Sequence, residues 1–97
     1  MWVDDEHLLL FSYDEGAAGA VEYHVDKERR TLTTTWSHTR PDPLLPFLGS
    51  AHRLDSGHTL INYGASGMLE EVTPDGVVIW SLSSPFGSWL GEGQALP

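Results

Sequence analysis

The sequence predicts an all-β fold without a helix, on three observations. Short apolar runs are separated by turn signals, and no stretch keeps apolar residues at helical spacing. Residues 8–37 and 60–81 also repeat one order of features: an apolar run near a tyrosine, a Glu/Val strand, and a closing Trp-Ser, with Trp36 and Trp80 44 positions apart. A β-rich repeat of about 40–50 residues is the size of one propeller blade. The chain is therefore expected to be a partial β-propeller of about two four-stranded antiparallel blades.

The turn signals divide the chain into seven expected strands. In order, these are 7–13, 20–26, 31–38, 49–54, 59–63, 68–73 and 77–82, and an eighth extended piece is expected at 88–95. The sharpest turn is Thr73-Pro74-Asp75-Gly76, because proline suits a type I turn and glycine accepts the left-handed conformation that follows. Gly57, in Asp55-Ser56-Gly57, is assigned the same structural role.

The strands group into four segments. Residues 1–40 are expected to form strands two to four of a blade whose innermost strand is missing, and 47–83 a complete blade. The stretch 41–46 is a proline-rich connection, since proline is excluded from central ladders. Residues 84–97 are assigned to a closing strand or to the inner strand of the next blade.

The runs 8–11 and 77–80, apolar on both faces, predict strands covered on both sides.

Composition excludes several classes of function. The 97 residues contain no cysteine, and the formal net charge of −9 argues against nucleic-acid binding, which needs clustered Lys and Arg. The five histidines lack ligand spacing, so no metal site is expected. No apolar run approaches the roughly 20 residues of a membrane span. The acidic start, Asp4-Asp5-Glu6, is unlike a signal peptide and reads as a solvated terminus, so the compartment stays open.

Two segments resemble a known family. Residues 49–62, Gly-Ser-Ala-His-Arg-Leu-Asp-Ser-Gly-His-Thr-Leu-Ile-Asn, resemble the inner-strand signature of the bacterial and archaeal arylsulfotransferase family, and residues 71–80 are similar to its blade ending. Gly76 and Trp80 fit the Gly-x-x-x-Trp spacing of quinoprotein-like repeats, and 87–97 looks like the family's C-terminal end.

The resemblance implies the C-terminal part of a six-bladed propeller. Such a protein transfers a sulfuryl group from a phenolic sulfate to a phenol through a transiently sulfated histidine, with no cofactor. A neutral imidazole is a suitable nucleophile near pH 7, and cationic and amide groups stabilise the charge on the transferred group. An exported or periplasmic location follows if the family's upstream pattern holds.

The sequence departs from the catalytic pattern at Gly49, because catalytically equipped blades carry a histidine at that position. No catalytic residue can therefore be carried over from the family. His52 and Arg53, neighbours on a predicted inner strand with side chains on opposite faces, are the local catalytic candidates. Polar contact between blades is the favoured interpretation of both.

Asn62 and Trp89 are the candidate binding residues, although a structural hydrogen bond is the favoured role for Asn62. Trp36 and Trp80 are interpreted as packing between blades rather than as a stacking platform. Glu70 and Glu71 are adjacent on a strand and point to opposite faces, so they cannot act as a carboxylate pair.

Two functions are carried forward. The first is a fragment of an arylsulfotransferase-like propeller, inactive alone, with aryl sulfate and phenol as ligands. The alternative is a non-catalytic propeller module for binding or scaffolding, completed by upstream blades or by oligomerisation; three copies of a two-blade unit would close a ring. Neither hypothesis has nucleic acid or membrane as a partner.

Overall fold

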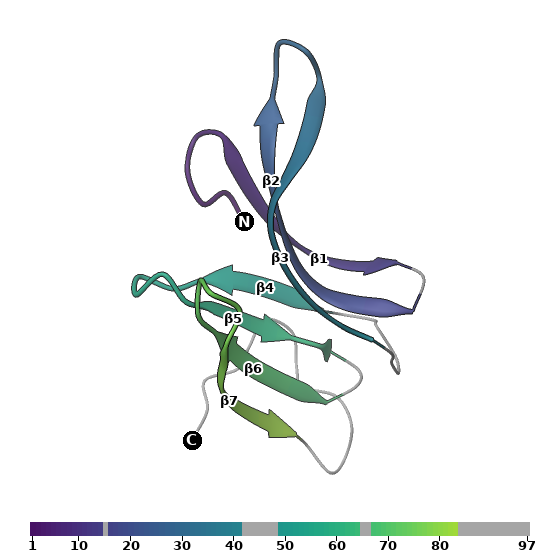
Figure 1. Cartoon of the computed structure of the whole chain (residues 1–97), viewed down its shortest axis with the longest axis vertical. Helices are drawn as coiled ribbons and strands as arrows, with labels where there is room; N and C mark the ends of the chain where they lie inside the picture. The colour runs from purple at the N-terminus through teal and green to yellow at the C-terminus, as the bar shows by residue number, and fades with distance from the viewer. Residues whose placement is uncertain (15, 42–48, 65–66, 84–97) are drawn as a thin grey trace.

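The computed structural model describes residues 1–14, 16–41, 49–64 and 67–83. These residues form two antiparallel sheets that lie face to face, with no α-helix among them, which confirms the all-β prediction (Figure 1). Each sheet is a simple meander in chain order, as expected for two neighbouring blades of a partial propeller. The eighth extended piece, expected at 88–95, lies outside the described residues.

The first sheet contains β1 (His7–Asp14), β2 (Ala17–Asp26) and β3 (Thr31–Pro41), in that order. The strands are longer than the sequence indicated, and β3 continues through Arg40 to Pro41. Pro41 is tolerated there because β3 is the outermost strand of this sheet. The hairpin formed by β2 and β3 projects beyond the second sheet (Figure 1).

The second sheet contains β4 (Ser50–Arg53), β5 (Thr59–Asn62), β6 (Met68–Val72) and β7 (Val78–Ser83). Gly57 and Gly76 have φ angles of 91° and 86°, so both turns use the left-handed conformation that favours glycine. Each of these glycines donates its N–H to the carbonyl three residues earlier, on Leu54 and Thr73 respectively.

The core lies between the two sheets. The first sheet contributes Leu9, Ala18 and Ala20 from the side that we call its inner face. The second sheet contributes four residues from what we call its facing side: Ala51, Ile61, Tyr63 and Val72. Leu9, Ile61 and Val72 are completely buried, and burying such side chains stabilises a fold by about 1.5–3 kcal/mol each.

The internal repeat is reproduced in the strand register. Glu22 pairs with Trp36 in the first sheet, and Glu71 pairs with Trp80 in the second. In both sheets a bulge follows that glutamate, so the residue preceding the tryptophan is left out of the pairing. The strands β1, β2 and β3 therefore occupy the positions of β5, β6 and β7.

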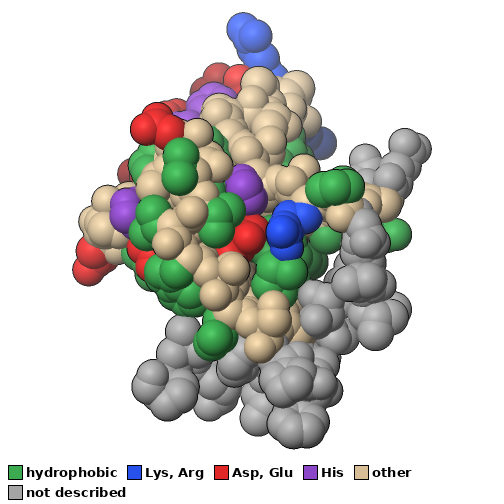
Figure 2. Space-filling view, turned by 60° about the horizontal axis from the view of Figure 1, so that its bottom comes forward, with side chains coloured by type: hydrophobic (Ala, Val, Ile, Leu, Met, Phe, Trp, Pro, Cys, Tyr) green, Lys and Arg blue, Asp and Glu red, His purple; other side chains and the backbone are tan. Residues whose placement is uncertain are grey.

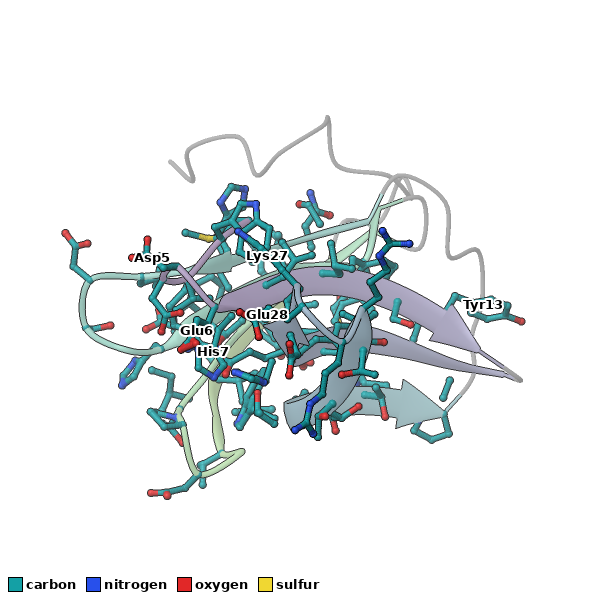
Figure 3. The ribbon with its side chains drawn as sticks, turned by 90° about the horizontal axis from the view of Figure 1, so that it is seen from above. Asp5, Glu6, His7, Tyr13, Lys27 and Glu28 are labelled. Atoms are coloured by element: carbon teal, nitrogen blue, oxygen red, sulfur yellow. The ribbon has the colours of Figure 1, made fainter. Side chains whose placement is uncertain are left out.

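The register corrects one detail of the repeat. Leu9 pairs with Glu22 as Leu60 pairs with Glu71, and counting from these pairs places Tyr63 at the position of Ser12, not Tyr13. Tyr63 is buried, whereas Tyr13 is 54% exposed. Figure 3 shows Tyr13 at one end of the first sheet, far from the labelled residues of the N-terminal turn.

The first residues of the chain also belong to the repeat. Met1 and Leu9 exchange two hydrogen bonds, from the Met1 amino group to the Leu9 carbonyl at 2.6 Å and from the Leu9 N–H to the Met1 carbonyl at 2.8 Å. The Val3 N–H donates to the His7 carbonyl just as the Leu54 N–H donates to that of His58, 51 positions later. Residues 1–3 thus lie beside β1 at the positions of residues 52–54, where the inner strand β4 ends. The sequence suggested no such pairing, because three residues are too few to show a strand pattern.

Asp4 closes the turn that follows and is not merely a solvated terminal residue. Its Oδ1 accepts hydrogen bonds from the N–H groups of Glu6 and His7, both at 2.8 Å, and from the His7 ring. These hydrogen bonds, that of Glu6 foremost, lower the pKa of Asp4, and the hydrogen bond to Asp4 raises that of His7. Figure 3 shows Glu6 and His7 next to each other in this turn.

The expectation of two-sided cover for residues 77–80 is not met within the described structure. Val77, Val78 and Ile79 are 57%, 42% and 48% exposed. The run lies on β7, the outermost strand of its sheet, where apolar side chains have a neighbouring strand on one side only. No helix in the described part of the chain is long and apolar enough to cross a membrane.

Candidate functional site

A buried carboxylate lies between the two sheets. Glu70 on β6 is 1% exposed, and its Oε1 accepts a hydrogen bond of 2.5 Å from the Tyr63 hydroxyl. The Nε2 atom of His38 lies 3.2 Å from the same oxygen, and Nε of Arg40 lies 3.9 Å from Oε2. We call these four residues the Glu70 cluster. A buried charge is tolerated when such partners surround it.

The strand geometry brings the cluster together from both sheets. Glu70 points from the facing side of the second sheet, while His38 and Arg40, two positions apart on β3, project from the inner face of the first. Gly19 on β2 lets β3 approach, because a Cβ there would collide with the His38 carbonyl oxygen. Histidine, acidic and basic side chains adjoin one another on the face seen in Figure 2.

Tyr63 acts in the cluster as a hydrogen-bond donor. Burial and the hydrogen bond to the Glu70 carboxylate raise the pKa of its phenol far above the usual value of 10. The phenol therefore stays protonated throughout the physiological range, and its proton is directed at Glu70. Neither a general base nor a phenolate nucleophile is available at this position.

A second polar group joins the sheets closer to β4. Arg53 donates from its NH2 atom to Oε1 of Glu22 at 2.9 Å and from Nε to Oγ1 of Thr59 at 3.0 Å. Its guanidinium also lies 5.4 Å from the ring centroid of Trp36, within cation–π range. The Trp36 indole N–H donates to the Pro74 carbonyl at 2.9 Å. Each of these contacts except that to Thr59 crosses from one sheet to the other.

Glu71 forms a third polar group, within the second sheet. Its Oε2 lies 2.7 Å from Nδ1 of His58, and its Oε1 accepts a hydrogen bond of 2.9 Å from the Trp80 indole. The hydrogen bond with His58, followed by that from Trp80, lowers the pKa of Glu71. Glu70 and Glu71 thus point to opposite faces, as expected from strand alternation.

The catalytic and binding candidates from the sequence do not converge. Arg53 is used in the contact with Glu22, while His52 pairs with Leu60 and so lies on the opposite face of the second sheet. Asn62 is 2% exposed, and its Oδ1 accepts a hydrogen bond of 2.7 Å from the Gly64 N–H, a structural use. Trp89 lies outside the described residues.

Gly49, at the position where the resemblance would place a catalytic histidine, packs against an aromatic ring. A Cβ at Gly49 would overlap the ring of Phe11, which itself makes an edge contact with Tyr63 at 5.8 Å between centroids. The sheet-to-sheet packing therefore requires glycine at position 49 unless the Phe11 ring moves.

The Glu70 cluster was missed by reasoning from sequence. One signal was present, since Glu70 alternates on β6 with the apolar residues Met68 and Val72, which share its face of the strand. Its partners lie on other strands, more than 25 positions away in the case of His38 and Arg40, and no spacing rule joins them. Within the described ranges no three His, Cys, Asp or Glu side chains are placed to hold a metal ion.

Comparison of this chain with protein-family models, with curated proteins and with solved structures gave no match. The candidate site is therefore interpreted from its own geometry.

Proposed function

We propose that this chain is a non-catalytic, propeller-like scaffold, whose working surface is a sheet face and not an active site. One observation carries the proposal: the polar side chains best suited to catalysis are held by other side chains of this chain, several of them from the opposite sheet. Arg53 is held by Glu22, Thr59 and Trp36, and Glu70 by Tyr63, His38 and Arg40. Side chains used in this way position the sheets and are not free to hold a substrate.

The charge of the Glu70 cluster supports the same proposal. Its central group is a carboxylate, and the chain as a whole carries a formal charge of −9. A sulfuryl donor is an anion, so it would be repelled by this field and would gain little from a protonated phenol held by Glu70. The cluster is better suited to joining two sheets than to stabilising a transferred anion.

Sulfuryl transfer from an aryl sulfate to a phenol is the second candidate function. It rests on the resemblance of residues 49–62 and 71–80 to arylsulfotransferase blades. Because Gly49 leaves no room for a side chain against Phe11, the sulfated histidine would be His52 or a histidine of further blades. The remaining blades, supplied upstream or by other copies, are then required partners, and a location outside the cytoplasm follows from the same resemblance.

One assay tests whether this chain is an enzyme on its own, since an arylsulfotransferase-like fragment would need further blades to act. Purified chain is incubated with p-nitrophenyl sulfate and phenol, and release of p-nitrophenol is followed by absorbance. A scaffold gives no release above that of buffer, and His52→Ala behaves like the unmodified chain. Release that His52→Ala abolishes, while the circular dichroism spectrum stays unchanged, would show that the chain is an enzyme.

A further inference from the structure

The first sheet has a second side, which we call its outer face, turned away from the second sheet. A groove of about 320 Å³ runs across it, lined by small, hydroxyl-bearing and apolar residues: Ser12, Ala17, Val21, Tyr23, Thr34, Ser37 and Thr39. Leu10, which pairs with Val21 on the same face, is 41% exposed, and Trp2, opposite Leu8, is 51% exposed. Leu10 thus adjoins the lining residue Val21, whereas Trp2 is not among the lining residues and has the Lys27 ammonium 5.3 Å from its ring centroid.

The repeat shows what kind of surface covers a face of this type. In the register shared by the two sheets, Leu10, Val21 and Tyr23 occupy the positions of Ile61, Glu70 and Val72. These three residues of the second sheet are at most 1% exposed, because the inner face of the first sheet covers them. The outer face is therefore the equivalent of a face that, within this same chain, packs against another β-sheet.

A second copy of the chain offers one available sheet face of this kind. The far side of the second sheet, which carries Glu71 and Trp80, is not available, since its central residues Leu69 and Asn62 are 1% and 2% exposed. The outer face of the first sheet is more accessible, because Val21 at its centre is 9% exposed and Leu10 beside it is 41% exposed. Two outer faces that meet form an isologous contact, which closes after two copies.

Charge favours the same contact. Two chains that each carry a formal charge of −9 repel one another, so they associate best through a surface without acidic side chains. Among the described residues that line the groove, the phenol of Tyr23 is the only ionisable side chain.

From these observations we propose that the chain forms a twofold-symmetric dimer through the outer faces of its first sheets. The proposal rests on the scaffold function, for which it names the working surface and the partner. Sheets that pack face to face in this way lie about 10 Å apart, with the side chains of each filling the hollows of the other. Small residues in the groove of one copy then receive Leu10 and Tyr23 of the other.

Sedimentation velocity of the full chain over a range of concentrations tests the proposal. We expect a species of twice the 10.7 kDa chain mass. Ser37→Arg places a cation in the groove from an exposed position on β3 and should weaken the dimer at least about tenfold, since the twofold axis brings two such charges together. Thr33→Arg is the matched control: it is exposed on the same strand, outside the groove, and should dimerise like the unmodified chain.

Three results would overturn the dimer: a single-chain mass for the unmodified protein at every concentration, a mass of three chains, or equal effects of Ser37→Arg and Thr33→Arg. Circular dichroism of each variant confirms that the sheets are retained. The scaffold function has a separate test, because p-nitrophenol release would contradict it. A monomer that releases no p-nitrophenol would therefore contradict the dimer but not the scaffold function.

Discussion

Trp36 and Trp80 occupy the same position in two successive sheets. Each lies opposite a glutamate, Glu22 or Glu71, at the edge of a bulge. Their indole N–H groups have different partners: that of Trp36 donates to the Pro74 carbonyl of the other sheet, and that of Trp80 to Glu71 of its own. One repeated strand pattern thus serves both contact between the sheets and contact within a sheet.

Introducing a histidine at position 49 should weaken the fold without creating activity. In Gly49→His the new side chain displaces the Phe11 ring from its contact with Tyr63, and overpacking of this kind costs about 1–3 kcal/mol. Urea unfolding measures the loss, and the p-nitrophenyl sulfate assay measures activity. If Gly49→His is as stable as the unmodified chain, the close packing of Gly49 on Phe11 is wrong.

Removing the Tyr63 hydroxyl should lower the stability of the fold, because the buried Glu70 carboxylate loses a hydrogen bond. Tyr63→Phe leaves Glu70 without its shortest hydrogen bond, and we expect the free energy of unfolding to fall by about 1–3 kcal/mol. Tyr13→Phe is the matched control, because Tyr13 is 54% exposed and its loss should change stability by less than about 0.5 kcal/mol. Equal effects of the two substitutions would argue against a hydrogen-bonded Glu70.

The pKa of Glu71 predicts a specific loss of stability in acid. Because its pKa in the folded chain lies below the ordinary value of 4.5, the carboxylate stabilises the fold above about pH 4.5, and this contribution disappears as the pH falls through the lowered pKa. The difference in unfolding free energy between the unmodified chain and Glu71→Gln should therefore shrink below pH 4.5. Glu28→Gln, at an exposed position, controls for the loss of one negative charge. A difference that does not change with pH would contradict the assignment.

One substitution in the turn between β2 and β3 should raise the stability of the fold. Arg30 has a φ angle of 57°, in the left-handed region, which costs a residue with a side chain roughly 1–2 kcal/mol relative to glycine. Arg30→Gly should therefore raise the midpoint of thermal unfolding, although the greater freedom of glycine in the unfolded chain offsets part of the gain. Arg29→Gly, one residue earlier and outside the left-handed region, should lower the midpoint. The reverse order would show that the turn has another geometry.

Much of the fold could be predicted from local patterns. Turn residues such as Gly57 and Gly76 and the apolar runs between them gave seven strands in the observed order, because turn chemistry and alternation are properties of adjacent residues. The inner-strand residues 1–3 were missed since their evidence is the pairing with β1. The sequence pattern matched Tyr63 with Tyr13, one position away from its true counterpart Ser12. Only the strand register determines which residues face one another.

The polar contacts between the sheets were less predictable. The sequence placed Arg53 on an inner strand and favoured contact between blades, but it did not indicate Glu22 as the partner. The Glu70 cluster was missed altogether, since its members come from β3, β6 and the end of β5 and meet only when two sheets pack. Such contacts depend on tertiary geometry, which a single sequence does not encode in a short motif.

In the proposed scaffold, Glu22 and Arg53 bind each other across the sheets and do not serve a ligand. A double-mutant cycle measures this directly, using the free energies of unfolding in urea of the unmodified chain, Glu22→Gln, Arg53→Met and the double variant. We expect the effects of the two substitutions on the free energy of unfolding not to add, with a coupling of about 0.5–3 kcal/mol. Additivity to within about 0.3 kcal/mol, together with unchanged stability of Arg53→Met, would contradict it and leave Arg53 free for another role.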